Sequence, residues 1–288
     1  MISYKLSYLK KLESETIYIL REIYKCFKKP VLLYSVSKDS AVLIRLIQKA
    51  FFPGTFPFPL IYIETGQEVS EIINYRTDCL KGIDTTHIFK GNIDHFYKKI
   101  DHSFQIGEKC YCKEFKNDEI QKIIDVLKFD AFINGVHIDE RGYNSKCVYT
   151  FDNVQNNIKL KVQDPEFWNL YNTNLSDEGI AVISPLNNWT ESDIWFYIKK
   201  ENIPVMPLYY ARKREMFLCK GRLYPVQLLN TAAPEYIKST DIKKELLMCR
   251  ILHLGCDFCN TFIKSKAENL DMIIQETIEK EFHNESEY

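Results

Sequence analysis

The sequence predicts an α/β protein in which a parallel sheet carries helices on both faces, followed by a smaller C-terminal region. The first observation behind this prediction is that short, wholly apolar runs alternate with longer segments whose apolar residues recur at helical spacing. Runs without polar alternation are typical of strands buried on both faces of a parallel sheet. The second is that suggestive polar sequences follow three of these predicted strands. Ligands of open α/β sheets bind there, beyond the carboxyl ends of the strands.

The expected elements alternate from the N-terminus onward. Apolar residues at helical spacing predict an amphipathic helix over residues 8–27, which ends before Pro30. Another helix is expected from Thr190 to about Lys200, because Thr190 can cap it and Asp193 stands at the reciprocal position of a capping box. We predict further helices at residues 41–50, 68–80, 116–127 and 270–282, and strands at residues 31–34, 60–63, 86–89, 131–133 and 181–183.

Two stretches lack this alternation. Residues 143–179 are polar, rich in asparagine and weakly periodic, so we expect a long loop near the site. The alternation of apolar runs and helical segments also becomes less regular beyond Met206. We therefore divide the chain into an N-terminal helix at residues 1–29, the main α/β domain at residues 30–205 and a C-terminal extension at residues 206–288.

Composition narrows the class of protein. The chain of 288 residues is 45% hydrophobic and 27% charged, enough for a sizeable core and ordinary for a soluble protein. It has neither an apolar run of about 18 residues nor a signal-peptide pattern, so we expect a cytoplasmic protein without a membrane partner. The formal net charge of -1 does not imply nucleic-acid binding through bulk charge. Nine cysteines, an odd number at irregular spacing, argue against a disulfide framework.

The strongest functional signal is the segment SVSKDS, which connects the first predicted strand to a helix. The unpaired N–H groups and the positive dipole end of such a helix form an anion site. Ser35 and Ser37 are small enough for the turn to approach a phosphate closely, and Ser40 adds a hydroxyl donor. Lys38 adds a cation, and Asp39 can orient the loop or hold Mg²⁺. The segment lacks the Walker A pattern; the alternative interpretation is an ordinary strand-to-helix turn.

The segment resembles the S-x-G-K-D-S loop of PP-loop ATP pyrophosphatases, which cleave ATP between the α and β phosphates. Ser37 stands where that loop has glycine, and serine costs about 1 kcal/mol if the position needs a positive φ. The wider chain resembles the family of phosphoadenylylsulfate reductases and sulfate adenylyltransferase small subunits, through residues 53–60, 64–66, 185–195, 201–204, 207–209 and 254–256. The resemblance implies a Rossmann-like adenine nucleotide α-hydrolase fold, with residues 30–205 as the ATP pyrophosphatase domain and ATP and Mg²⁺ as ligands.

The resemblance also implies roles for single residues. The residues that would hold the phosphates are Ser35, Ser37, Lys38, Asp39 and Ser40, and those expected beside the nucleotide are Thr65, Gly66 and Gly135. Lys38, Asp39, Asp139 and Arg141 would take part in catalysis.

One segment departs from the family pattern. Val136, His137 and Ile138 stand where the adenylyltransferases carry arginine. Arginine makes a bidentate oxyanion contact that histidine supplies only weakly, so we expect poor sulfate binding unless Arg141 or Arg212 compensates. For His137 itself, a satisfied polar loop residue and a catalytic residue are equally good interpretations. Trp189 and Trp195, at helical spacing, are expected in the core.

Two cysteine pairs form a second signal. Cys110 and Cys112 make a C-x-C motif, and Cys256 and Cys259 make a C-x-x-C motif. Four thiolates suffice for a tetrahedral zinc or an iron–sulfur cluster. The pairs resemble those of the cluster-binding members of the family, which implies a 4Fe-4S cluster. The alternative is four unrelated thiols.

These features predict an enzyme in which an oxyanion attacks the α-phosphorus of ATP and pyrophosphate leaves. The first hypothesis is sulfate activation to adenylylsulfate with a GTPase partner subunit. The alternative is an iron–sulfur ATP pyrophosphatase that activates a nucleic-acid phosphate or base for phosphorothioation or thiolation, supplied with sulfur by a cysteine desulfurase. A third hypothesis is a nucleotide-binding regulatory protein with a degenerate loop.

Overall fold

The computed structural model describes residues 7–64, 70–81, 83, 86–90, 112–137, 149–152, 161–163, 180–227, 243–255 and 260–285. The chain forms two compact units. Unit 1 comprises Met1–Tyr62, Leu80–Ile88 and Gln121–Pro204, and unit 2 comprises Ile63–Cys79, Phe89–Ile120 and Val205–Tyr288. None of the helices in the described ranges is long and apolar enough to cross a membrane.

The sheet that unit 1 is built on has the order β3-β2-β1-β4-β7-β5-β6. β1 pairs in parallel with β2 and β4, and β4 pairs in parallel with β7. The predicted parallel sheet is therefore confirmed. The chain moves from β1 to β2 on one side and places β4 on the other, so the strand order reverses between β1 and β4. Ligands of open α/β sheets bind at such a switch point. The strands are β1 (Pro30–Leu33), β2 (Leu60–Glu64), β3 (Thr86–Lys90), β4 (Ala131–Ile133), β5 (Tyr149–Asp152), β6 (Lys161–Gln163) and β7 (Ile180–Ile183).

The expected long loop at residues 143–179 is wrong where β5 and β6 lie. β5 pairs antiparallel with both β7 and β6, so a hairpin extends the parallel sheet at one edge. These strands have four and three residues, too few for a periodic pattern to emerge from a polar sequence. The other residues of the segment lie outside the described ranges.

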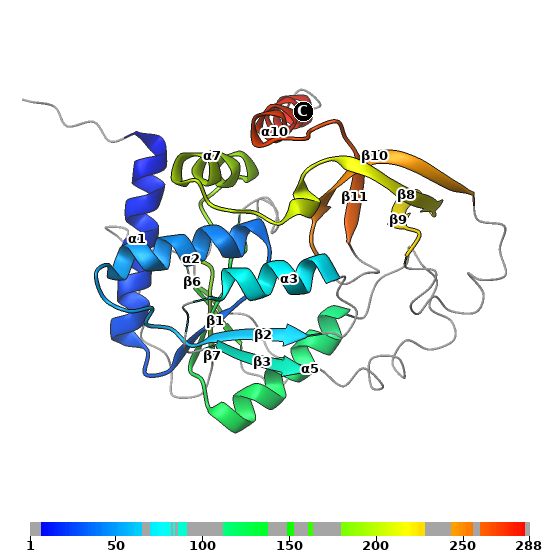
Figure 1. Cartoon of the computed structure of the whole chain (residues 1–288). Helices are drawn as coiled ribbons and strands as arrows, with labels where there is room; N and C mark the ends of the chain where they lie inside the picture. The colour runs from blue at the N-terminus through cyan, green and yellow to red at the C-terminus, as the bar shows by residue number, and fades with distance from the viewer. Residues whose placement is uncertain are drawn as a thin grey trace, which may run out of the picture. The chain divides into compact units, whose positions relative to one another are not determined.

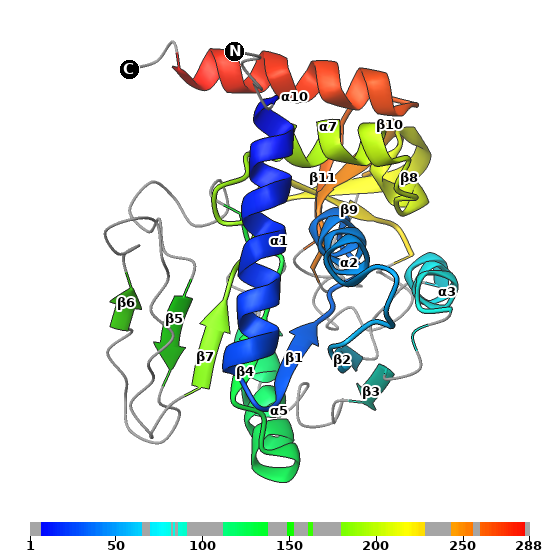
Figure 2. The same cartoon turned by 90° about the vertical axis from the view of Figure 1, so that its left-hand side faces the viewer.

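Helices of unit 1 lie on both faces of the sheet (Figures 1 and 2). Helices α1 (Tyr8–Cys26) and α2 (Lys38–Phe51) lie on one face of the sheet, and the C-terminal part of α5 (Cys112–Leu127) lies on the other (Figures 1 and 2). The amphipathic helix predicted at residues 8–27 is confirmed, since α1 buries one stripe of side chains against its neighbours. That stripe consists of Leu12, Thr16, Ile19, Leu20 and Ile23.

Helix α7 (Glu191–Glu201) also belongs to unit 1 and begins with the predicted capping box. The Thr190 side chain accepts from the Asp193 backbone, and the Asp193 side chain accepts from the Thr190 backbone. Trp189 and Trp195 are each 1% exposed, which confirms them as core residues. The Trp189 indole packs edge-on against Tyr197 at 5.1 Å between ring centroids.

Unit 2 contains a closed barrel that the sequence analysis missed. Its strands β8 (Arg212–Cys219), β9 (Arg222–Pro225), β10 (Lys244–His253) and β11 (Thr261–Lys264) follow the order β10-β11-β9-β8 with antiparallel pairing. The burial along β8 and β10 does not alternate, so the period-2 signal of a strand was absent. Unit 2 also contains α3 (Ser70–Cys79), the 3-10 turn η1 (Pro207–Tyr209) and α10 (Leu270–Glu285), the last of which confirms the helix predicted at residues 270–282.

Candidate active site

The β1–α2 connection has the geometry of an anion-binding turn. Ser37 is the N-cap of α2, with an extended backbone (φ -72, ψ 164), and its Oγ accepts from the Ser40 backbone N–H at 3.2 Å. The positive φ of this turn falls on Val36, at 63°. Serine in place of the family glycine therefore carries no φ penalty. A β-branched residue at positive φ is a true outlier, and the buried surroundings of Val36 hold it there.

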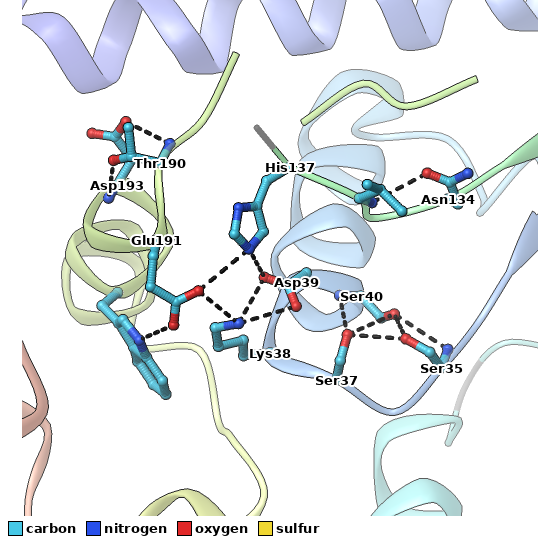
Figure 3. Close-up of polar contacts among 12 residues, drawn as sticks. Ser35, Ser37, Lys38, Asp39, Ser40, Asn134, His137, Thr190, Glu191 and Asp193 are labelled. Atoms are coloured by element: carbon cyan, nitrogen blue, oxygen red, sulfur yellow. Dashed lines mark hydrogen bonds and ion pairs between the residues drawn. The ribbon is translucent and has the colours of Figure 1, made fainter. Parts of the chain in front are cut away.

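Three serine hydroxyls meet at the start of α2 (Figure 3). The Oγ atoms of Ser35 and Ser40 lie 2.7 Å apart, and the Ser35 hydroxyl donates to Ser37 Oγ at 2.9 Å. The backbone N–H of Ser35 donates to Ser40 Oγ at 3.2 Å. Because a hydroxyl rotates to suit its partner, all three can turn their hydrogens toward an anion at this helix end. The structure thus brings together the three serines that the sequence predicted.

The end of β4 packs directly against this turn. A Cβ atom on Gly135 would lie 3.2 Å from the backbone carbon of Asp39 and 3.3 Å from the Ser40 nitrogen, so any larger residue would push against the start of α2. Asn134 fixes the connection, because its Oδ1 accepts from the Val136 backbone N–H at 3.1 Å and also from the Ser184 hydroxyl. Gly135 therefore lies beside the start of α2 through close backbone packing, and its place beside the nucleotide stays a prediction.

A buried cluster of charged side chains adjoins the loop (Figure 3). The Lys38 Nζ lies 3.2 Å from both carboxylate oxygens of Asp39 and 3.0 Å from Oε2 of Glu191. His137 Nε2 lies 3.3 Å from that same Glu191 oxygen and 3.6 Å from Asp39 Oδ1. The Lys38 and His137 side chains are 2% and 1% exposed. The cluster thus draws its ionisable side chains from three elements. The start of α2 contributes Lys38 and Asp39, the connection after β4 contributes His137, and α7 contributes Glu191.

Glu191 was missed by the sequence analysis. It is the first residue of α7, directly after the cap at Thr190. The predicted capping box and the resemblance of residues 185–195 to the family were the signals that could have found it. Its Oε1 accepts from Trp195 Nε1 at 2.8 Å, one turn along the same helix. Burial by itself would raise the pKa of Glu191, but the Lys38 charge and the His137 hydrogen bond outweigh it and hold this pKa far below its usual range.

His137 points into this cluster and is a charge partner of carboxylates. Burial lowers its pKa, but the hydrogen bond to Glu191 and the charge of Asp39 outweigh burial and the opposing Lys38 charge. The net effect raises the pKa of His137 above the ordinary value. His137 Nε2 thus faces two carboxylates, those of Glu191 and Asp39.

Asp39, His137 and Glu191 form a group of three potential metal donors within 4.8 Å of one another. The Lys38 ammonium already contacts both carboxylates, and an imidazole is a poor ligand for Mg²⁺. These donors therefore fit an ammonium better than Mg²⁺, and we assign no metal to them.

Comparisons with known proteins identify the family of this chain. The profile of the phosphoadenosine phosphosulfate reductase domain matches residues 29–260. The chain belongs to this family. Members named sulfate adenylyltransferase subunit 2 include one from Bacteroides fragilis (strain YCH46), 36% identical over 95% of this chain and 88% of that protein. Another from Stutzerimonas stutzeri (strain A1501) is 37% identical over 95% and 90%.

A solved family member is also similar in structure. Phosphoadenylyl-sulfate reductase from Candida auris aligns with 72% of this chain and 92% of that chain, at 20% identity and a TM-score of 0.48.

Several residues predicted for this member of the phosphoadenosine phosphosulfate reductase domain family fall outside the described ranges. They are Thr65, Gly66, Cys110, Asp139, Arg141, Cys256 and Cys259. Cys112 begins α5, but its side chain is not among those described. Arg212, considered as a substitute for the missing arginines, is an exposed residue at the start of β8.

Proposed function

We propose that this protein is the nucleotide-binding catalytic subunit of a sulfate adenylyltransferase, which transfers the adenylyl group of ATP to sulfate and releases pyrophosphate. The observation that carries the proposal is the 36–37% identity, over 95% of the chain, to proteins named sulfate adenylyltransferase subunit 2. The serine-lined helix start at the β1–β4 switch point supports it independently, because a helix start of this kind binds phosphate.

The reaction is a displacement at the α-phosphorus. A sulfate oxygen forms a bond to that phosphorus, and the bond from phosphorus to the α–β bridging oxygen breaks. Pyrophosphate leaves with the electron pair of the broken bond. The protein contributes positioning and charge stabilisation and forms no covalent intermediate of its own.

In this proposal the residues of the β1–α2 connection have different roles. The Ser35, Ser37 and Ser40 hydroxyls and the N–H groups at the start of α2 hold phosphate oxygens. Lys38 supplies the positive charge that balances the developing pyrophosphate. Mg²⁺, which travels with ATP, supplies further charge neutralisation when bound. Asp139 and Arg141, predicted near the triphosphate, remain proposals.

We propose two further properties that the names of the relatives support only in outline. A protein named subunit 2 works with at least one other subunit, and we propose that this partner is a GTPase that drives the uphill formation of adenylylsulfate. We also propose that the enzyme acts in the cytoplasm.

The alternative function is sulfur insertion into a nucleic acid. The C-x-C and C-x-x-C pairs favour it, since Cys110, Cys112, Cys256 and Cys259 could together hold a 4Fe-4S cluster. The identity to sulfate adenylyltransferase subunits favours the first function. Under the alternative, a cysteine desulfurase would be the partner.

One experiment separates the two functions. The purified protein is incubated with ATP, Mg²⁺ and sulfate, with and without the candidate GTPase and GTP, and both pyrophosphate and adenylylsulfate are measured. The proposal requires adenylylsulfate that depends on sulfate and increases with the GTPase. The result that would favour sulfur insertion has two parts. Pyrophosphate release would not depend on sulfate but would rise with added tRNA or DNA, and the anaerobically purified protein would contain iron.

A further inference from the structure

The Lys38 ammonium is engaged by carboxylates of the buried cluster. It faces two of them, those of Asp39 and Glu191, at 3.0 to 3.2 Å, next to the helix end where phosphates would bind. Lys38 cannot support the phosphates in this arrangement unless it exchanges one of its two carboxylate contacts.

The contact with Glu191 is the exchangeable one. Asp39 is the next residue of the same helix turn and moves with Lys38. Glu191 comes from α7, where Trp195 Nε1 and the capping box hold it in place. Lys38 is the first residue of α2, so its backbone lies at the anion site, and its four-carbon stem is flexible. The ammonium can therefore leave Glu191 and turn toward a phosphate without moving either helix.

His137 lowers the free-energy cost that this exchange has for the buried Glu191 carboxylate. Its Nε2 lies 3.3 Å from the oxygen that Lys38 contacts, so the carboxylate keeps an ion-pair partner in the protonated imidazole when the ammonium leaves. A buried carboxylate without any donor would be far more costly. Figure 3 shows Lys38 and His137 reaching Glu191, while the three serines lie on the other side of Asp39.

We propose that Glu191 is a positioning residue that competes with the triphosphate for the Lys38 ammonium. This inference rests on the proposed function, because it needs ATP at the loop. In the free protein Glu191 retains the ammonium inside the cluster, and nucleotide binding releases it. Because only molecules whose Lys38 ammonium has left Glu191 bind the triphosphate fully, the apparent affinity for ATP is the intrinsic affinity multiplied by the fraction of such molecules.

The test is the substitution Glu191→Gln in the full chain. Glutamine keeps the length of the side chain and an acceptor for Trp195, but it removes the charge that retains Lys38. Binding of the α,β-methylene analogue of ATP is measured by calorimetry, with circular dichroism and thermal unfolding to verify the fold. We expect the dissociation constant to fall about tenfold, because the competition is removed. A residue with a merely structural role would leave the constant unchanged or raise it.

Two further variants show that the effect passes through Lys38. Glu201→Gln removes a carboxylate from the same helix, where it pairs with Lys49 and Arg45, and should leave the dissociation constant unchanged. In a Lys38→Ala background, Glu191→Gln should lose most of its effect on affinity. An equal effect with and without Lys38 would overturn the proposal, since it would reduce Glu191 to a general electrostatic influence.

A measurement on the unmodified protein remains decisive if Glu191→Gln does not fold. The ammonium resonance of Lys38, assigned by its loss in Lys38→Ala, is followed by NMR during titration with the same analogue. It should shift strongly, whereas that of Lys49, which also contacts two carboxylates, should not. Analogue binding without a Lys38 shift would overturn the inference and leave the proposed function intact. A protein that binds no analogue would refute both.

Discussion

The Trp195 indole and the Glu191 carboxylate form a hydrogen bond of 2.8 Å within one turn of α7. The bond fixes Oε1 of Glu191 and leaves Oε2 directed at Lys38 and His137. The Lys38 ammonium also lies 6.0 Å from the centroid of the Trp195 ring. A side chain that belongs to the core thus sets the orientation of the charged cluster.

Replacement of Trp195 by phenylalanine should therefore affect both stability and the site. The variant loses the indole donor and part of the packing, so we expect the free energy of unfolding to fall by about 2 kcal/mol in urea denaturation. ATP affinity should change as well, because Glu191 is no longer fixed. Trp189→Phe is the control: it breaks the bond to Thr16 and should cost similar stability without changing ATP affinity. Equal affinities in the two variants would contradict this role of Trp195.

Gly135→Ala should weaken nucleotide binding. The added methyl group would meet Asp39 and Ser40 at 3.2 to 3.3 Å and displace the start of α2, where overpacking costs about 1–3 kcal/mol. We expect about a tenfold loss of ATP affinity, measured by calorimetry. Gly221→Ala, at φ +76 with open space around it, should cost about 1 kcal/mol of stability and leave ATP affinity unchanged. Unimpaired binding by Gly135→Ala would mean that the loop tolerates displacement.

Ser37 offers a test of the loop conformation. Its φ of -72 needs no glycine, and its Oγ caps α2. Ser37→Ala should lower the free energy of unfolding by about 1 kcal/mol, and Ser37→Gly by only a few tenths, because glycine is a tolerable N-cap. Chemical denaturation compares the three proteins. If Ser37→Gly were more stable than the unmodified protein, the extended backbone at Ser37 would be in doubt.

The ion pairs that join α1, α2 and α7 should make stability depend on acid pH. Lys49 Nζ lies 2.6 Å from Glu13 and 2.9 Å from Glu201. Burial alone would raise the pKa of Glu201, but hydrogen bonds and charges of Lys49 and Arg45 outweigh it, so the net effect lowers this pKa. A lowered pKa stabilises the fold above the unfolded value of about 4.3 and stops doing so as pH falls through the folded value.

The variant Glu201→Gln measures this contribution. It should reduce the free energy of unfolding by about 1 kcal/mol near pH 7, and the difference from the unmodified protein should disappear in strong acid. Urea denaturation at a series of pH values follows the difference. A difference that persists unchanged to the lowest pH would show that Glu201 contributes by packing alone.

Much of unit 1 could be predicted because its signals are local. The strand–loop–helix unit around SVSKDS, the stripe of α1 and the capping box of α7 each depend on residues a few positions apart. The hairpin of β5 and β6 and the barrel of unit 2 could not be predicted in the same way. Their strands are short or lack alternating burial, and their stability comes from pairing with distant strands.

The sequence by itself determined that a strand-to-helix turn follows the first strand and that Thr190 starts a helix, because backbone capping is local. Only the tertiary structure decided what the charged residues do. It brought Glu191 of α7 to Lys38 and His137 of the β4 connection to Glu191, and it placed the positive φ of the turn at Val36 and not at Ser37. Buried charges must find partners wherever the chain supplies them, and those partners depend on which strands and helices become neighbours.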